Sequence, residues 1–170
     1  FSHASIRYAT SIIKNFFLFF KMQNYACISP KLIQLPRKRK ANSHRALTEE
    51  DFQRINKAIN PDSFLSLRDL VIVNLLWDTG MRVSELCDLD MISIDEQNSK
   101  AIVSTKKTSN MRVVVWSVKT QELLSKYITM RTDLDGCESQ ALFVGTKGKG
   151  CWSKRLTTRT IQRMLKEYCS

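Results

Sequence analysis

Apolar residues recur at helical spacing along most of this 170-residue chain, which predicts a mainly helical fold. Residues 4–23 are predicted to form one helix, whose isoleucines and phenylalanines make a broad apolar face that needs a partner surface. The segment 64–78 repeats apolar residues at the same spacing, and it is expected to be the buried central helix. Further helices are predicted at residues 49–59, 83–89, 118–131 and 157–169.

Two of these helices have recognisable ends. Thr48 precedes three acidic residues, so its hydroxyl can cap the positive end of the helix that starts at residue 49. Gly80 follows the central helix and is predicted to be its C-terminal cap.

Strand signals are confined to two short places. The stretch AIVSTKKTSNMRVVVWS, residues 101–117, has two β-branched runs joined by a polar turn, which is typical of a hairpin. ALFVG, residues 141–145, is predicted to be a short strand. The expected fold class is therefore α+β, mainly α with a small antiparallel hairpin or sheet.

The composition changes between the first two predicted helices. Pro30, Pro36 and small polar residues surround the basic run Arg37, Lys38, Arg39 and Lys40, and this composition is typical of a linker. The basic run could stay solvated or lie along a phosphate backbone. We therefore divide the chain into the end of a helical domain at 1–34, a basic linker at 35–47, and a second domain at 48–170.

The charge is strongly positive and unevenly distributed. Lys and Arg number 27 against 16 Asp and Glu, a net charge of +11, which indicates a polyanionic partner or an anionic membrane surface. Residues 1–47 hold nine basic residues and no acid, and residues 147–170 hold seven against one glutamate. The apolar run near the N-terminus is too short to span a bilayer.

The five cysteines are scattered and never spaced as Cys-x-x-Cys. Neither a zinc site nor a disulfide framework is expected, and a reducing, cytoplasmic compartment fits best.

Candidate chemistry lies in WDTGMRVSELCDLD, residues 77–90, where Arg82 follows a Thr-Gly turn and precedes a short amphipathic stretch containing Glu85. Thr-Gly-x-Arg-x-Ser-Glu-Leu resembles the first conserved box of the tyrosine recombinases, also called the phage integrase family, which include the Xer-like site-specific recombinases. The resemblance extends from the basic linker and LTEEDF through the lysine-bearing hairpin to the LF strand and final helix.

The resemblance implies a reaction and roles for particular residues. In this family a tyrosine attacks a DNA phosphodiester and forms a 3′-phosphotyrosyl intermediate, without a metal or nucleotide cofactor. Arg82 would clamp two phosphate oxygens, since a planar guanidinium meets both at once. Glu85 lies three residues after Arg82 on the same helix face, which favours an orienting role toward the arginine or nearby backbone, with a solvated carboxylate as the alternative. A hairpin lysine would protonate the departing 5′-oxygen. Lys107 is favoured for this role, with its neighbour Lys106 as the alternative.

Further basic residues are predicted to contact DNA. Arg112 would support a phosphate contact, whereas the final helix would enter the major groove, as it does in the family. The full set of expected DNA contacts is Arg37, Lys38, Arg39, Lys40, Arg112, Lys154, Arg155, Thr158, Arg159 and Arg163.

The family also requires a His-x-x-Arg box, a later His or Trp and the nucleophilic tyrosine, and no such series follows Arg82 within these residues. We therefore expect a fragment that holds the end of a core-binding (SAM-like) domain and the front part of a catalytic domain. The fragment itself is expected to be inactive. Its full-length parent would act on double-stranded DNA as a homotetramer.

Two alternatives remain open at this point. A non-catalytic DNA-binding protein with a decayed integrase fold would keep the same helices. The type IB topoisomerases share the catalytic constellation, but the TGMRVSEL wording is more similar to the recombinases.

Overall fold

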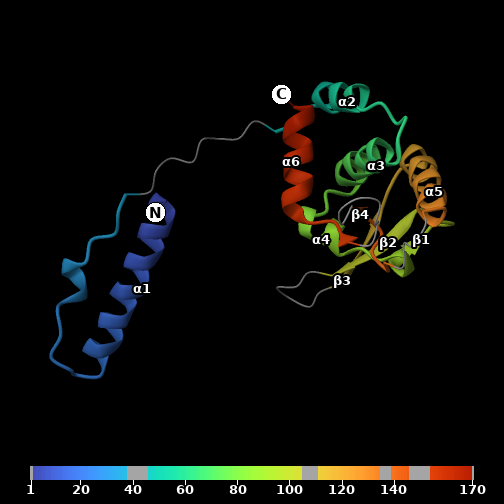
Figure 1. The fold of residues 1–170 in the computed structure, drawn as a ribbon. Helices are drawn as coiled ribbons and strands as arrows, with labels where there is room; N and C mark the ends of the chain where they lie inside the picture. The colour runs from blue at the N-terminus through green and yellow to red at the C-terminus, as the bar shows by residue number, and fades with distance from the viewer. Residues whose placement is uncertain (1, 38–45, 105–110, 135–138, 146–153, 170) are drawn as a thin grey trace. The chain divides into compact units, whose positions relative to one another are not determined.

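The computed structural model describes residues 2–37, 46–104, 111–134, 139–145 and 154–169 (Figure 1). The chain divides into two compact units, residues 1–46 and residues 47–170.

The first unit contains one long helix, α1 (His3–Met22), and a short 3₁₀ turn, η1 (Pro30–Leu32). Ser2 caps α1, because its hydroxyl accepts the Ser5 N–H at 3.1 Å. The helix predicted at 4–23 is confirmed, and none of its residues is buried within the described part of the chain. The described helices, α1 included, are all too short or too polar to cross a bilayer.

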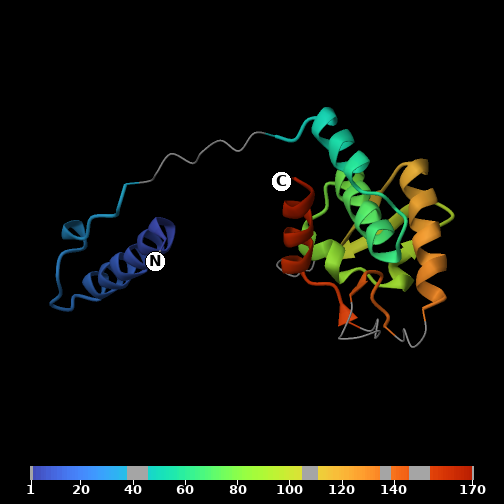
Figure 2. The ribbon, with the colours of Figure 1, turned by 45° about the horizontal axis from the view of Figure 1, so that its top comes forward.

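In the second unit a buried helix is surrounded by the other helices (Figures 1 and 2). Helix α3 (Phe64–Thr79) is the centre, and every residue from Leu67 to Leu75 is buried. Helix α5 lies on one side of it and α6 on the other (Figures 1 and 2). The remaining bounds are α2 (Glu49–Ala58), α4 (Val83–Asp88), η2 (Met91–Ser93), α5 (Val118–Thr132) and α6 (Thr158–Tyr168).

All five helices predicted in this region are confirmed, because their start and stop signals are local. Thr48 and Asp51 form a capping box at the start of α2, in which each side chain bonds the backbone N–H of the other residue. Gly80 ends α3 in the left-handed region, with φ of 58°, and its N–H donates to the Leu76 carbonyl at 3.1 Å.

Two small antiparallel sheets complete the second unit. The first has the order β1 (Ile94–Asp95), β2 (Lys100–Ser104), β3 (Met111–Val115), which confirms the predicted hairpin. The second pairs β4 (Val144–Gly145) with β5 (Lys154–Arg155). The predicted strand at 141–145 is shorter than expected, although Ala141 forms an isolated bridge with Asp90.

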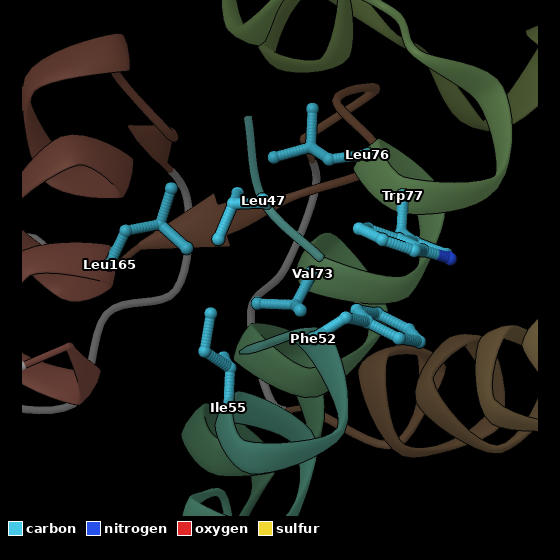
Figure 3. A pocket seen from close by; sticks show the side chains of 7 residues that line it. All are labelled: Leu47, Phe52, Ile55, Val73, Leu76, Trp77 and Leu165. Carbon is cyan, nitrogen blue, oxygen red and sulfur yellow. The ribbon is translucent and has the colours of Figure 1, made fainter. Parts of the chain in front are cut away.

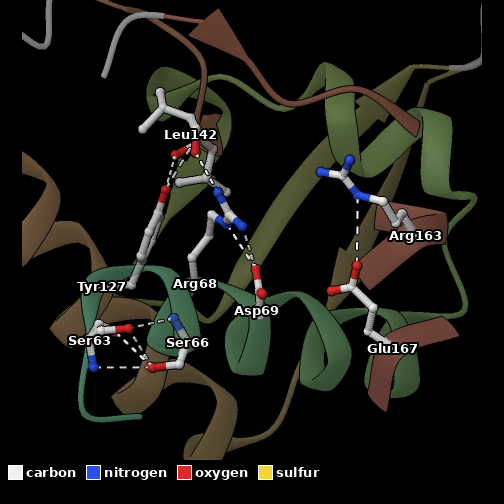
Figure 4. A network of polar contacts seen from close by, with 9 residues as sticks. Ser63, Ser66, Arg68, Asp69, Tyr127, Leu142, Arg163 and Glu167 are labelled. Atoms are coloured by element: carbon white, nitrogen blue, oxygen red, sulfur yellow. Dashed lines mark hydrogen bonds and ion pairs between the residues drawn. The ribbon is translucent and has the colours of Figure 1, made fainter. Parts of the chain in front are cut away.

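Two contacts from helices hold the segment that carries β4 (Figure 4). The Tyr127 ring packs between Phe64 and Phe143, and its hydroxyl donates to the Leu142 carbonyl at 3.1 Å. On α3, Arg68 donates to the Val144 carbonyl at 3.1 Å and to the Asp69 carboxylate at 2.6 and 2.9 Å.

Burial raises the pKa of Asp69 above its ordinary value, and the Arg68 guanidinium partly opposes that shift. The Arg68–Asp69 ion pair lies inside the unit. The bond from Arg68 to the Val144 carbonyl anchors the second sheet to α3.

Replacing Gly80 by alanine is predicted to destabilise the second unit by about 1 kcal/mol, because a side chain is strained at positive φ. Gly80→Asn should cost less, since asparagine tolerates this region. Urea-induced unfolding followed by circular dichroism measures both. Gly145→Ala is the matched control, because no positive φ is required there. Equal losses for the Gly80→Ala and Gly145→Ala variants would contradict the explanation.

Candidate functional site

Arg82 lies where the chain changes direction between α3 and α4. It is the N-cap residue of α4, two positions after the left-handed Gly80, and it has an extended backbone. Its side chain is 67% exposed. The turn therefore presents a guanidinium at the protein surface directly beside the core, because the intervening Met81 is buried.

A buried carboxylate holds Arg82 at both its backbone and its side chain. Glu85 is the third residue of α4, and its side chain is only 3% exposed. Its Oε2 accepts the Arg82 backbone N–H at 2.8 Å, which satisfies one donor at the helix start. Its Oε1 accepts from Arg82 Nη1 at 3.0 Å. This is the geometry that an orienting partner needs.

The same carboxylate is held from a second element, strand β3. Arg112 Nη1 donates to Glu85 Oε1 at 2.9 Å, and Arg112 Nη2 donates to Oε2 at 2.8 Å. This hydrogen bonding raises the pKa of Arg112 above its ordinary value. Sequence reasoning assigned Arg112 to a phosphate and missed the Glu85 contact, because the two residues come from elements whose packing no local pattern reveals.

Several predicted site residues lie outside the described residues. Lys106 and Lys107 belong to the segment between β2 and β3, and Lys38, Arg39 and Lys40 belong to the segment before α2. Arg37, which precedes that second segment, is exposed. Their roles stay predictions.

The predicted DNA contact Arg155 is used inside the unit. From β5, its Nη1 donates to the carbonyls of Cys87 at 2.9 Å and Leu89 at 3.2 Å, and its Nη2 pairs with Asp90. A cation at these carbonyls complements the negative end of α4. Arg155 therefore ties the second sheet to the helix that carries Glu85, whereas its neighbour Lys154 is exposed.

Helix α6 separates into an apolar and a basic face. Ile161 and Met164 are buried, whereas Thr158, Arg159 and Arg163 are exposed. Arg163 lies 3.9 Å from Glu167 on the same helix (Figure 4). A cavity of about 340 Å³ lies beside this face and is lined by Leu65, Arg68, Gly145, Lys154, Arg155, Leu156, Thr157, Thr160 and Arg163.

An apolar groove of about 150 Å³ lies between α2, α3 and α6 (Figure 3). Phe52 and Trp77 stack at its edge with ring centroids 4.4 Å apart. Its lining residues are Leu47, Phe52, Ile55, Val73, Leu76, Trp77 and Leu165, none of which has an ionisable side chain. Among the described residues, His, Cys, Asp and Glu side chains form no group that could hold a metal ion.

Comparison with known proteins identifies a matching family and several similar proteins. A model of the phage integrase family matches residues 45–170. Tyrosine recombinase XerC of Thermodesulfovibrio yellowstonii is 26% identical over 172 residues, covering 98% of this chain and 55% of that protein. Tyrosine recombinase XerA of Pyrococcus furiosus is 33% identical over 124 residues, covering 73% of this chain and 40% of that protein.

Solved structures show the same fold. A crystal structure of XerA recombinase matches with a TM-score of 0.62 and 28% identity, covering 99% of this chain and 54% of that one. Lambda integrase residues 75–356 bound to DNA match with a TM-score of 0.67 at 18% identity, covering 98% of this chain and 56% of that one. The chain thus spans about half the length of the proteins it matches.

Replacing Glu85 by alanine is predicted to lower the free energy of unfolding of the second unit by about 1–2 kcal/mol, because α4 loses a capping acceptor and two arginines lose a shared partner. Glu85→Gln should cost less, since its amide oxygen can still accept the Arg82 N–H. Denaturant unfolding of the two variants measures the difference. Unchanged stability in Glu85→Ala would show that the carboxylate does not hold the turn.

Proposed function

The chain belongs to the phage integrase family of tyrosine recombinases, and we propose that the full-length protein breaks and rejoins DNA at specific sites. The reaction would proceed through a 3′-phosphotyrosyl intermediate whose tyrosine lies outside these residues. The observation that supports this proposal best is the exposed Arg82 guanidinium held on the buried Glu85 carboxylate.

Arg82 has the chemistry that the transition state of phosphoryl transfer needs. Negative charge develops on the non-bridging phosphate oxygens, and a guanidinium offers them paired N–H donors in one plane. Of the side-chain nitrogens of Arg82, only Nη1 is hydrogen-bonded within the described part of the chain, so Nε and Nη2 remain for a phosphate. Glu85 fixes the backbone and the side chain of Arg82, and a positioned donor costs little reorganisation at the moment of reaction.

A lysine from the segment between β2 and β3 would supply the proton that the reaction also needs. We propose Lys107, with Lys106 as the alternative, as the general acid that protonates the departing 5′-oxygen. The antiparallel strands on either side support a turn at this place, because Ser104 pairs with Met111 at the end of the ladder.

We propose three segments: residues 1–34 close a helical core-binding domain, residues 35–47 form a basic linker, and residues 48–170 form the front part of the catalytic domain. The exposed apolar face of α1 supports the first assignment, since Ile12, Phe16 and Phe19 would pack against other helices of such a domain. The share of each relative that this chain covers is consistent with this division.

Double-stranded DNA is the proposed partner. The basic run at Arg37–Lys40 and the exposed basic face of α6, with Thr158, Arg159 and Arg163, would follow its phosphates and groove. Related structures contain lambda integrase as a tetramer bound to a Holliday junction, and we propose a homotetramer on DNA for the full-length protein. The protein would work in the cytoplasm, associated with DNA.

In the full-length protein, Arg82→Ala is predicted to slow DNA cleavage by about 10²–10³-fold, because a positioned donor to the transition state is lost. The cleavage rate of the Arg82→Lys variant should lie between that of the wild-type protein and that of Arg82→Ala. Covalent trapping on a nicked duplex, read as an SDS-stable protein–DNA complex, measures the rate. Arg54→Ala is the matched control, since Arg54 is exposed on α2 and pairs with Asp51 instead of Glu85. If the wild-type protein binds DNA without trapping, a non-catalytic DNA-binding protein is the better description.

DNA binding by the 170-residue chain is predicted to weaken steeply with salt, because basic residues release counterions from phosphates. The double substitution Arg39→Gln/Lys40→Gln should reduce the slope of log K against log salt by about 2. Mobility shift at several salt concentrations gives this slope. The matched control is Arg54→Gln/Lys57→Gln, which removes the same charge from α2 and should leave the slope unchanged. Equal slopes for all three proteins would exclude the linker from the DNA contact.

A further inference from the structure

We propose that Arg112 is a positioning residue for Arg82: it occupies and neutralises the Glu85 carboxylate, so that Arg82 keeps its positive charge for a phosphate. This inference rests on the proposed function, in which Arg82 binds a phosphate. It assigns Arg112 a role different from the phosphate contact that its basic character suggested.

Arg82 and Arg112 share the Glu85 carboxylate. Each Glu85 oxygen accepts one N–H from Arg82 and one from Arg112. Arg112 commits both terminal nitrogens in a bidentate pair, at 2.9 and 2.8 Å, whereas the Arg82 side chain contributes one nitrogen at 3.0 Å. Arg112 is therefore the stronger side-chain partner, because parallel N–H bonds add both energy and alignment.

Arg112 also changes the net charge beside Arg82. Glu85 with Arg82 alone would be a neutral pair, and an approaching phosphate would meet a cation already compensated by a carboxylate 3.0 Å away. Among the described residues, Arg82 and Arg112 share this anion, so these three side chains together carry a net charge of +1. The attraction between Glu85 and each arginine is stronger here than in bulk water, because the Glu85 side chain is only 3% exposed.

Exposure decides which guanidinium meets the ligand. The Arg82 side chain is 67% exposed and the Arg112 side chain 41%. Arg82 also keeps Nε and Nη2 without a hydrogen bond in the part of the chain that the structure describes. The excess charge is therefore available mainly at Arg82, and Arg112 acts through the carboxylate.

The contact also joins two elements that are distant in sequence. Arg112 pairs with Val103 in the ladder between β2 and β3, and Glu85 lies on α4. The ion pair thus sets the distance between the strand hairpin and the helix that presents Arg82. Both terminal nitrogens must reach both oxygens, so this link fixes orientation as well as distance.

The test follows the Arg82 Nε–H resonance of the 170-residue chain by NMR during titration with inorganic phosphate. Sodium chloride at matched ionic strength is the reference. We expect Arg112→Gln to raise the phosphate Kd by about fivefold, because Glu85 then loses its bidentate cation and compensates Arg82 more fully. Arg112→Lys should restore part of the affinity, as a point charge without the bidentate geometry.

The double variant Glu85→Gln/Arg112→Gln separates charge from folding. It removes one anion and one cation, so the local charge returns to that of the wild-type cluster while the glutamine still accepts the Arg82 N–H. We expect its phosphate Kd to return to within about twofold of the wild-type value. Arg54→Gln lowers the net charge by the same single unit at an exposed site on α2, where Arg54 pairs with Asp51, and should leave the Kd unchanged.

Each contrary outcome has a distinct meaning. If Arg82 responds to phosphate in the wild type and Arg112→Gln leaves the Kd unchanged, the inference is wrong and the proposed function stands. If Arg112→Gln weakens binding and the double variant does not recover it, Arg112 acts through folding alone and the inference is also wrong. A wild-type Arg82 resonance that ignores phosphate would overturn both.

Discussion

A single buried carboxylate determines the geometry of the candidate site. Glu85 is nearly inaccessible to water, so its charge is stable only with cationic partners and hydrogen bonds. Those partners come from the turn after α3 and from β3, while Glu85 itself lies on α4. A helix of six residues has little stability of its own, and this carboxylate connects it to β3, while Arg155 and the buried Leu86 connect it to the rest of the unit.

The positive charge of the chain has two different uses. Arg68, Arg131 and Arg155 donate to backbone carbonyls of the segments at 87–89 and 139–144, so they hold irregular backbone that has few ladder bonds of its own. The exposed residues of the outer face of α6, Arg159 and Arg163, donate to no backbone carbonyl in the part of the chain that the structure describes. Composition counts both groups alike, and only the fold distinguishes the arginines that bond to backbone carbonyls from those whose side chains are exposed.

Sequence alone predicted the helices, the β2–β3 hairpin and the Arg82 turn, because each leaves a local signal: Gly80 ends α3, and Thr48 starts α2. The strands β1 and β5 were missed, since two residues are too short for any period. The partners of Arg112 and Arg155 were missed for a different reason. An exposed-looking arginine has the same local pattern whether it meets DNA or a carboxylate, and the choice depends on tertiary packing.

The division of α6 has a practical consequence. Its inward side, with Ile161 and Met164, supports the core, and its outward side, with Arg159, Gln162 and Arg163, is exposed. Because successive outward residues can vary without opening a void, this helix is a natural position for a randomised library. Variation could be confined to those three codons, which leaves the residues of the Arg82 cluster unchanged.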